Sequence, residues 1–352
     1  MTELNRLLES IHPVSVELRD AARRRIDHLT KPIGSLGKLE SNAARLVQVF
    51  GTTDLRIRRR VIFTFAADHG VAEVAGVSLY PRSVTGQMVL NFLTGGAAVN
   101  VLARQAHAEV RVIDAGTLTP IGDPRLIQKR IGPGTRNFLN ECAMTREEAV
   151  RCLEWGADVF FEEYRNAPID MAGVGDMGIG NSTSAAAVLC ALSGRPAQEV
   201  AGRGTGLDDK GLSRKVSVID ESLKQRRPNP ADAVDVLAKV GGFEIGEMAG
   251  CFLGGASRRC AMLVDGFIST AAAALAIRLR PGVQDYLFFS HQSAEQGHAR
   301  ALQDLKATPI LDLEMRLGEG TGAAVAMHVL DCAVAMYRDM ATFESAGVDT
   351  AT

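Results

Sequence analysis

Apolar positions follow two different periods along the chain. Up to about residue 50 they recur at helical spacing, which predicts amphipathic helices. The positions at this spacing are Leu4, Leu7, Leu8 and Ile11, and then Leu39, Ala43, Leu46, Val47 and Phe50. From Val61 onward, short runs rich in β-branched and aromatic residues take over. Each of these runs ends in Asp, Ser or Gly and is followed by a helical segment, which indicates strands that alternate with helices.

The second pattern predicts a parallel β-sheet wrapped by helices, an α/β fold. The five predicted strands are residues 61–66, 110–113, 169–174, 262–264 and 286–289. The predicted helices among them include residues 84–92, 97–105, 146–164, 182–192 and 294–305. Ligands of such sheets bind at the carboxyl ends of the strands, so the polar residues that follow each strand should gather on one edge.

A change in composition near residue 60 predicts two domains. At 352 residues the chain is long for a single core, which favours this division. We expect an α/β domain over residues 60–318 and a smaller helical domain from residues 1–59 plus 319–352. Glu319 would then lie where the two domains meet.

Charge and composition narrow the classes of function. The 39 basic and 41 acidic residues are interspersed and leave a net charge of −2, so we expect neither a nucleic acid nor a membrane surface as a partner. Charges at Glu3, Arg6 and Glu9 interrupt the N-terminal segment, which differs from a signal peptide and favours a cytoplasmic location. The most apolar run, residues 268–277, is far shorter than the ~20 residues of a membrane helix.

The cysteines and histidines show no pattern of metal ligands. Six cysteines are scattered without a C-x-x-C pair, which is typical of reduced, packed thiols. Among the seven histidines, His291 and His298 are too far apart for the i, i+4 pair of a helical zinc site. We therefore expect no bound metal and no cofactor.

The stretch from Leu317 to Gly322 places one carboxylate, Glu319, between glycines and ahead of an apolar helical run. Glycine permits backbone conformations closed to other residues and lets a ligand approach the main chain. The free N–H groups of the following helix would point back at this loop. Two interpretations stay open: a first-turn acid that faces solvent and the helix dipole, or a carboxylate that accepts a proton from a substrate at the mouth of a cleft.

A first glycine loop contains the spelling G-x-G-x-x-G between a predicted strand and a predicted helix, at residues 173–178. Dinucleotide binding also requires an acid at the end of a second strand ~20 residues further on. Glu199 is near that distance, but it stands in a Pro/Gly turn with no strand before it, which argues against NAD. What remains is a phosphate or ribose site at the helix N-terminus, with Asn181, Ser182 and Thr183 as donors.

A second glycine loop, residues 202–206, leads through Asp208 and Asp209 to Lys215. Backbone N–H groups and a lysine suit a monophosphate. The alternative is a helix-capping loop with exposed charges, and the sequence leaves both open. The acidic pair also resembles the one that ordinary phosphoribosyltransferases use for magnesium pyrophosphate. No long hydrophobic strand precedes it here, which argues against that class.

Eight motifs, in order, carry a resemblance to a known family. They are Lys31 to Glu40 (KPIGSLGKLE), Ala67 to Val71 (ADHGV), Tyr80-Pro81 with Val84-Thr85, Gly173 to Thr183 (GVGDMGIGNST), Lys239 to Phe243 (KVGGF), Asp265 to Phe267 (DGF), Ser290 to Glu295 (SHQSAE) and Arg316 to Gly322 (RLGEGTG). Together they resemble the signatures of the nicotinate-nucleotide-dimethylbenzimidazole phosphoribosyltransferases. The likeness covers residues 31–336, nearly the whole chain.

The resemblance implies a reaction of cobalamin biosynthesis. The phosphoribosyl group of nicotinate mononucleotide passes to a nitrogen of 5,6-dimethylbenzimidazole, with inversion at the anomeric carbon, giving α-ribazole 5′-phosphate and nicotinate. By the same resemblance Glu319 is the general base that takes the imidazole N–H proton, a role suited to a partly desolvated carboxylate. The leaving group departs as a neutral pyridine, so the implied chemistry requires no metal.

The resemblance also implies the residues that hold the substrates. The phosphate and ribose of the donor would contact Gly178, Asn181, Gly204, Lys215 and Gly266, with Ser290 and Ser293 close by. The slot for the flat benzimidazole ring would be lined by Tyr80, Met88, Met177 and Leu317. Asp176 stands where relatives commonly carry Glu. Its side chain is one methylene shorter, so a second acidic role there is an open question.

The family fold is a Rossmann-like α/β domain with a smaller helical domain built from both chain ends, and the family likeness implies a homodimer. Two alternatives remain. One is a phosphoribosyltransferase of the same fold that prefers another base, such as adenine or a phenol, because apolar pockets discriminate by only ~1–3 kcal/mol per methylene. The other is a non-catalytic nucleotide binder.

Overall fold

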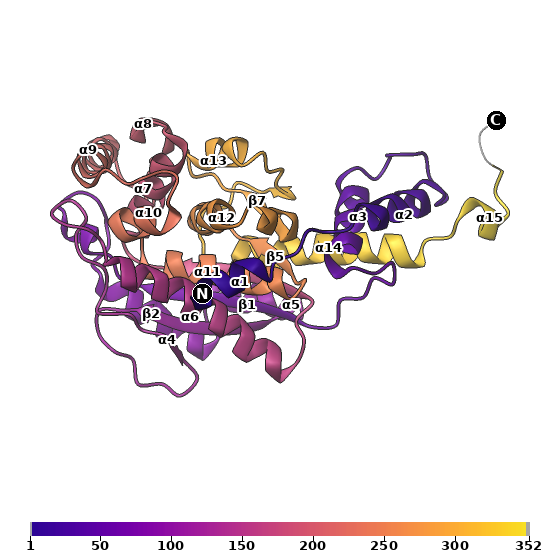
Figure 1. The fold of residues 1–352 in the computed structure, drawn as a ribbon, viewed down its shortest axis with the longest axis horizontal. Coiled ribbons are helices and arrows are strands. Elements are labelled where there is room, and N and C mark those ends of the chain that lie inside the picture. Colours follow the sequence, from indigo (N-terminus) through magenta and orange to yellow (C-terminus); the bar gives the residue numbers. More distant parts are fainter. Residues whose placement is uncertain (1, 350–352) are drawn as a thin grey trace.

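The computed structural model describes residues 2–349, and a six-stranded parallel sheet lies at its centre (Figure 1). The strand order is β3-β2-β1-β4-β5-β6, the order of the Rossmann fold. The strands are β1 Arg60–Ala67, β2 Glu109–Gly116, β3 Ile127–Gln128, β4 Met171–Met177, β5 Ala261–Val264 and β6 Leu287–Phe289. The predicted α/β fold is therefore confirmed, and all five predicted strands are present.

The central strands are buried on both faces because helices cover the sheet on both sides. In β1 every residue after Arg60 is buried, which is why its sequence is almost continuously apolar. Ile62 is paired with Val110 of β2 on one side and with Gly173 of β4 on the other. The direction of winding reverses between β1 and β4. A ligand of this fold is expected at the carboxyl ends of these two strands.

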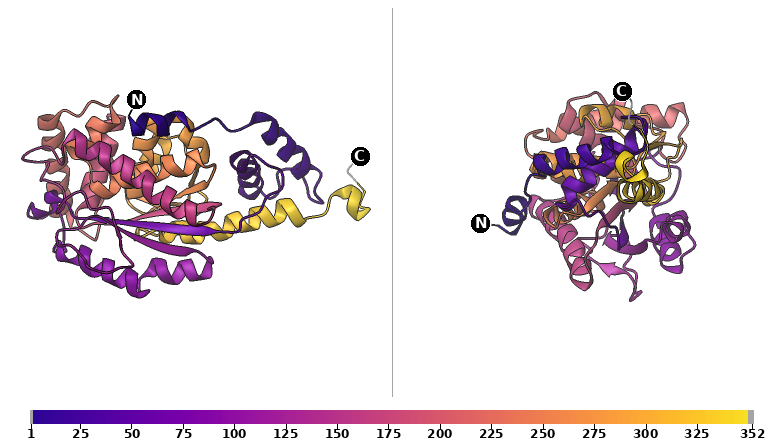
Figure 2. Two further views of the ribbon diagram at one scale, coloured as in Figure 1. Left: turned by 60° about the horizontal axis from the view of Figure 1, so that its bottom comes forward. Right: turned by 90° about the vertical axis from the view of Figure 1, so that its right-hand side faces the viewer.

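Two layers of helices enclose the sheet (Figure 2). One face carries α6 (Arg146–Asn166), α11 (Phe243–Ser257) and α12 (Phe267–Leu279). The opposite face carries α4 (Ser83–Thr94), α5 (Ala98–Gln105) and the first half of α14 (Thr321–Asp339). The remaining helices around the α/β body are α7 Asn181–Ser193, α8 Ala197–Val200, α9 Asp209–Arg226, α10 Ala233–Val240 and α13 His298–Asp304.

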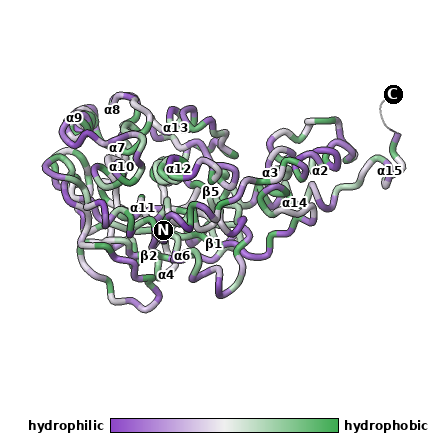
Figure 3. Tube along the Cα trace, in the orientation of Figure 1, coloured by the Kyte–Doolittle hydropathy of each residue, from purple (hydrophilic) through white to green (hydrophobic). Residues whose placement is uncertain are grey.

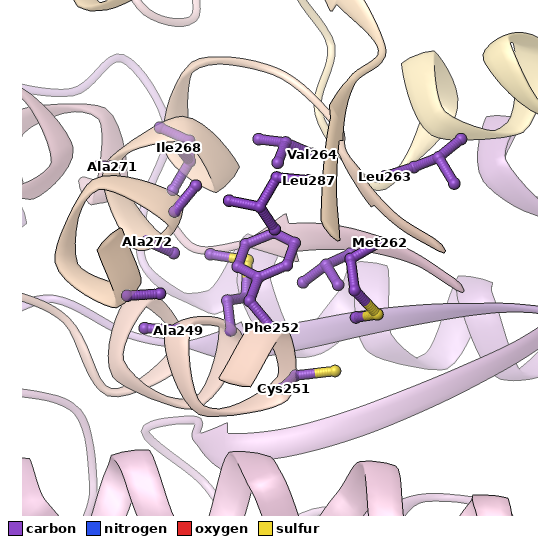
Figure 4. Close-up of a cluster of buried hydrophobic side chains, with 14 of the residues drawn as sticks. Ala249, Cys251, Phe252, Met262, Leu263, Val264, Ile268, Ala271, Ala272 and Leu287 are labelled. Carbon is purple, nitrogen blue, oxygen red and sulfur yellow. The ribbon is translucent and has the colours of Figure 1, made fainter. Parts of the chain in front are cut away.

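Part of the hydrophobic core lies between the sheet and helices α11 and α12. Figure 4 shows Phe252 of α11 packed among side chains of β5, β6 and α12, including Met262, Leu287 and Ala272. Outer helices such as α2 (Val16–Asp27) and α9 show both hydrophobic and hydrophilic stretches along the chain, as expected for amphipathic helices (Figure 3). Helix α11 has no face exposed to solvent over its first fourteen residues, because all of them are buried.

Helices α6 and α11 contact each other through their backbones, and glycines make this possible. A methyl group built on Gly156 of α6 would lie 1.9 Å from the carbonyl oxygen of Glu247. One built on Gly250 of α11 would lie 2.0 Å from the carbonyl oxygen of Leu153. The crossing therefore excludes any side chain at either position.

A helical unit projects from one end of the α/β body (Figures 1 and 2). It consists of α2 (Val16–Asp27), α3 (Lys38–Phe50), the second half of α14 and α15 (Phe343–Ala346). Arg25 donates hydrogen bonds to the carbonyl oxygens of Tyr337 and Arg338, which ties α2 to the end of α14.

Helix α1 (Glu3–Glu9) lies apart from this unit, against α6 and α11 of the α/β body. The backbone N–H of Leu4 donates to the carboxylate of Glu154 at 3.2 Å. The division into residues 60–318 and residues 1–59 plus 319–352 stays a prediction. The contacts of α2 and α3 with α14 support it, and those of α1 and of the first half of α14 link the two parts.

Three short strands and one helix boundary differ from the expected pattern. Strand β3 and the small parallel pair β7 (His291–Gln292) and β8 (Leu311–Asp312) have two residues each, too few to show a period. Helix α13 begins at His298 rather than at residue 294. Ala294 instead donates its N–H to the carbonyl oxygen of Met315, in a loop that belongs to the site.

The segment of residues 83–105 is long enough and apolar enough to cross a membrane, judged by its length and composition alone. In the structure they form two helices, α4 and α5, separated at Gly95, where φ is 82°. Both helices pack on the sheet.

Substitution of Gly156 by Ala tests the crossing of α6 and α11. We expect the free energy of unfolding to fall by about 1–3 kcal/mol, because the new methyl group has no room against the backbone of α11. Chemical denaturation measures this change. The matched control is Gly86→Ala in α4, where the nearest atom to a new methyl group is 3.8 Å away, and a gain of about 0.5–1 kcal/mol is expected. Equal effects of the two substitutions would contradict the prediction.

Candidate active site

A cavity of about 340 Å³ opens at the carboxyl ends of β4 and β5, beside the point where the winding of the sheet reverses. Its walls come from six segments that are distant in sequence: the loop before α4, the β4–α7 turn, the second glycine loop, the start of α12, the segment around β7 and the loop before α14. The volume falls in the range of small-molecule sites.

The loop that carries Glu319 lies directly on β4. Gly318, Glu319 and Gly320 all have positive φ, at 88°, 66° and 102°. The N–H of Glu319 donates to the carbonyl oxygen of Asp176 at 3.2 Å, and Thr64 Oγ1 donates to the carbonyl oxygen of Glu319 at 2.8 Å. A methyl group on Gly175 would lie 2.2 Å from the nitrogen of Gly320. The backbone of Glu319 is thus fixed by two strands.

The side chain of Glu319 is buried and accepts a hydrogen bond from the N–H of Val99, at the start of α5, at 3.2 Å. Burial raises the pKa of its carboxyl group. Leu317 and Gly318 line the cavity, whereas Glu319 lies behind them and is not part of the wall. A carboxyl group with a raised pKa next to a cavity has the properties of a general base.

Asp265, at the end of β5, holds the first turn of α14. Its Oδ1 accepts from the N–H of Ala323 at 2.9 Å and its Oδ2 from the N–H of Gly320 at 3.1 Å. It therefore caps the helix from a distant part of the chain. Burial raises the pKa of Asp265 to about 7, the backbone N–H groups oppose that shift, and the charge of Glu319 adds to it.

Asp176 is the third buried acid of this region and lines the cavity. Its Oδ2 accepts from the side-chain amide of Asn181 at 2.8 Å. Burial, and next the charge of Asp265, raises the pKa of Asp176 well above its ordinary value. With Asp265 and Glu319, it makes this end of the cavity acidic.

The other end of the cavity is basic. Lys215 is fully buried, and its ammonium group donates to Ser182 Oγ at 2.9 Å and to the carbonyl oxygen of Gly202 at 3.0 Å. Burial lowers the pKa of Lys215 to about 8, and the charge of Glu295 opposes that shift. Arg316 donates to the carbonyl oxygen of Gly204 at 3.2 Å. We call Ser182, Gly204, Lys215 and Arg316 the anion seat.

The buried side chain of His298 holds the cavity wall between the acidic end and the basic end through hydrogen bonds. His298 Nδ1 accepts from the N–H of Ser293 at 2.7 Å, and its Nε2 lies 2.9 Å from Thr270 Oγ1. Burial lowers the pKa of His298 to about 3, so the ring is neutral. Because Nδ1 accepts, the proton is on Nε2 and is donated to Thr270.

The structure brings together most of the residues predicted for substrate binding. Those that line the cavity are Tyr80, Asp176, Gly178, Asn181, Gly204, Gly266, Ser293 and Leu317. Lys215 lies immediately behind Ser182. Tyr80 and Leu317 are exposed, with 52% and 59% of their surface accessible, so the apolar wall is at the mouth of the cavity.

Five predicted residues lie outside the cavity wall: Met88, Met177, Lys215, Ser290 and Glu319. Met88 and Met177 are half-buried and pack on the hydrophobic core. Ser290 is fully buried, and its hydroxyl group has no hydrogen-bond partner among residues 2–349. The roles of all the predicted site residues, inside and outside the wall, stay predictions.

Several residues of the site had no role in the sequence-based prediction. Arg203, His291, Glu295 and Arg316 line the cavity, and Asp265 fixes the loop before α14. Each is inside or next to a recognisable motif, but charge and spacing do not show which of them turn toward one cavity.

The first glycine loop differs from a dinucleotide fingerprint in its geometry. Gly173 and Gly175 lie within β4, not in the turn after it. A methyl group on Gly173 would lie 2.8 Å from the Cβ atom of Ala323, so both glycines make room for α14 and its preceding loop. Asp208 also has a structural contact, because its carboxylate accepts from the N–H of Gly211 and caps α9.

Comparison with known proteins finds the family that the ordered motifs resemble, and the match extends over nearly the full length of the chain. The family profile described as "Phosphoribosyltransferase" matches residues 11–348. A nicotinate-nucleotide-dimethylbenzimidazole phosphoribosyltransferase of Geobacter sulfurreducens is 52% identical over 349 residues, which cover 99% of each chain. The chain belongs to this phosphoribosyltransferase family. The family predicted from the ordered motifs is therefore confirmed.

Further members support this assignment. The enzyme of the same name from Desulforudis audaxviator is 49% identical, over 100% of this chain and 99% of its own. A crystal structure of CobT from Thermus thermophilus is 43% identical and superposes with a TM-score of 0.91, over 95% of this chain and 100% of that one. The Rossmann-like fold is thus that of the phosphoribosyltransferase family.

Substitution of Asp265 by Ala tests the cap on α14. Two buried N–H groups lose their acceptor, and we expect the free energy of unfolding to fall by about 1–3 kcal/mol. Asp265→Asn keeps one acceptor and should lose less. Chemical denaturation of the three proteins provides the measurement.

The fall in the free energy of unfolding of Asp265→Ala, called its deficit below, should also depend on pH. The pKa of Asp265 is about 7 in the folded protein against an ordinary value of 3.8. The stability that Asp265 contributes through its bound proton is therefore fully present below its ordinary pKa of 3.8, and it is lost progressively as pH rises to about 7. The deficit should be larger at pH about 5 than at pH about 8, and a deficit that grows with pH would contradict this assignment.

Proposed function

We propose that the protein transfers the phosphoribosyl group of nicotinate mononucleotide to 5,6-dimethylbenzimidazole in cobalamin biosynthesis. The products are α-ribazole 5′-phosphate and nicotinate. The observation that carries the proposal is a single cavity with a cationic anion seat at one end and buried carboxyl groups beside an apolar mouth at the other, in a chain of this family. One end suits a phosphate, and the other suits a flat base that must lose a proton.

The donor nucleotide lies with its phosphate at the anion seat. The ammonium group of Lys215 and the guanidinium group of Arg316 supply positive charge, while Gly204 and Ser182 supply close backbone and hydroxyl contacts. Ribose then extends past Gly178, Gly266 and Ser293, and Asn181 presents its amide group to the same space. This placement directs the anomeric carbon toward the acidic end.

The acceptor base enters between Tyr80 and Leu317 at the mouth of the cavity. Both side chains are exposed, and an apolar ring that covers them removes their surface from water. The ring then lies beside the loop of Glu319 and within reach of Asp176, which already lines the cavity. We assign Met88 and Met177 to the deeper part of the slot, on the strength of the family likeness.

The reaction exchanges one C–N bond for another. A ring nitrogen of the base attacks the anomeric carbon, and the bond from this carbon to the pyridinium nitrogen breaks, so nicotinate leaves with the bonding pair. Glu319 takes the proton of the imidazole N–H, which leaves the new nucleotide neutral at its base. A carboxyl group whose pKa is raised by burial binds this proton more tightly than an exposed one.

A homodimer in the cytoplasm is part of the same proposal. It rests on the family likeness and on the composition of the chain, and sedimentation of the purified protein tests the dimer.

The first test identifies the products. The protein is incubated with nicotinate mononucleotide and equimolar dimethylbenzimidazole, benzimidazole and adenine, and we expect α-ribazole 5′-phosphate as the dominant new mass. A dominant phosphoribosyl-adenine would favour the alternative acceptor. Nucleotide binding without release of nicotinate would favour a non-catalytic binder, and either result would contradict the proposal.

The second test replaces Glu319 by Gln. Removal of a general base should lower kcat by about 10²- to 10⁴-fold while the KM for the donor changes little. The rate of the unmodified enzyme should rise with pH through the raised pKa of Glu319, since the base acts only when it has lost its proton, and this rise should be absent in the variant. Glu314→Gln, an exposed glutamate of the same loop, is the control. Unchanged turnover in Glu319→Gln removes this residue from the base role.

A further inference from the structure

The anion seat contains a carboxylate of its own, that of Glu295. Glu295 lines the cavity together with Gly204 and Arg316. A methyl group built on Gly202 would lie 1.7 Å from Glu295 Oε2, so the carboxylate fills the space that glycine leaves. Oε2 is buried and has no hydrogen-bond partner among residues 2–349.

Glu295 has no ion-pair partner that would explain its position. Within residues 2–349 no cationic nitrogen approaches its carboxylate closely enough for a salt bridge. Lys215 directs its hydrogen bonds elsewhere, toward Ser182 and the carbonyl oxygen of Gly202. The carboxylate is therefore near positive charge without being tied to it, which is the position that a bound phosphate would take.

The electrostatics of the seat agree with this geometry. Burial raises the pKa of Glu295, while the charges of Lys215 and Arg316 and the backbone N–H of Gly204 oppose the rise. A dianion bound at the seat would add a like charge and stabilise the protonated carboxyl group further. Binding of the anion and binding of a proton to Glu295 are thereby linked.

We propose that Glu295 occupies the anion seat of the empty enzyme as an internal counter-ion, and that a phosphate binds there together with one proton taken up by Glu295. The inference rests on the proposed function only for the identity of the natural anion, the 5′-phosphate of a nucleotide. Loss of that proton restores the repulsion and favours release of the phosphorylated product.

Other ionisable side chains around the anion seat come from the glycine loop, the loop before α14, α13, β7 and α9. Arg203 of the glycine loop and Arg316 of the loop before α14 both line the cavity. His298 of α13, whose N–H donates to the carbonyl oxygen of Glu295, is neutral, and burial lowers the pKa of His291 of β7. Lys215 loses its charge only as pH approaches about 8.

Three further acids belong to the opposite end of the cavity. They are Asp176, Asp265 and Glu319, and burial raises the pKa of each. A substitution of Glu295 alone therefore separates its contribution from theirs.

Sulfate is the chosen probe because it remains a dianion across the pH range of interest, so only the protein titrates. Isothermal calorimetry gives the Kd of sulfate, and repetition in two buffers of different ionisation enthalpy gives the number of protons taken up. Two like unit charges ~4 Å apart in water change an equilibrium constant about fivefold, and sulfate carries two charges. Glu295→Gln should therefore bind sulfate at least about fivefold more tightly than the unmodified protein at pH about 8.

Proton uptake gives the second readout. The unmodified protein should take up protons when sulfate binds, and Glu295→Gln should take up fewer by as much as one. Glu221→Gln, an exposed glutamate on α9, is the matched control and should behave like the unmodified protein. Sulfate affinity of Glu295→Gln that is equal to or weaker than that of the unmodified protein at pH about 8 would overturn the inference, since Glu295 would then support the seat.

A second variant, Glu295→Asp, tests the inference independently in case Glu295→Gln does not fold. Glu295→Asp keeps the charge but withdraws it from the seat by one methylene, and it should also bind sulfate more tightly than the unmodified protein. Equal or weaker binding would again overturn the inference. Neither readout involves turnover, so failure of the transferase assay leaves this test intact, and a protein active as a transferase can still fail it.

Discussion

The site depends on one steric constraint, the direct contact between the backbone of β4 and the loop that precedes α14. No side chain fits between Gly175 and the Glu319–Gly320 peptide. Because the two backbones touch, Asp176 can accept the N–H of Glu319, and Thr64 on the neighbouring strand can donate to its carbonyl oxygen. The positive φ of Glu319, uncommon for a residue with a Cβ atom, is held by these contacts.

One end of the cavity is acidic and the other is basic, because different segments of the chain form the two ends. The acidic end is built by β4, β5 and the loop before α14, where three carboxyl groups are buried close together and all have a raised pKa. The basic end is built by α9 and by residues that flank the small β7–β8 sheet. Under the proposed function, this division orients a substrate that has an anionic group and a proton-bearing ring.

The sequence allowed the α/β fold to be predicted because strands buried on both faces are almost continuously apolar and each ends at a polar residue. The ordered motifs also allowed the glycine loops and Glu319 to be singled out, through their resemblance to a known family. The sequence did not show that Gly173 and Gly175 accommodate a helix, because a glycine needed for packing and one needed for a ligand look alike. Nor did it show Asp265 or Glu295, whose importance arises from contacts with residues 58 and 93 positions away in the chain.

Helix α14 joins two regions that would otherwise be independent. Its 19 residues span about 28 Å. The first turn is anchored by Asp265 beside the loop of Glu319, and the last turns are bound by Arg25 in the projecting helical unit. Because both ends of α14 are held by hydrogen bonds, the position of the projecting unit and the position of the loop that carries Glu319 are coupled through one continuous helix.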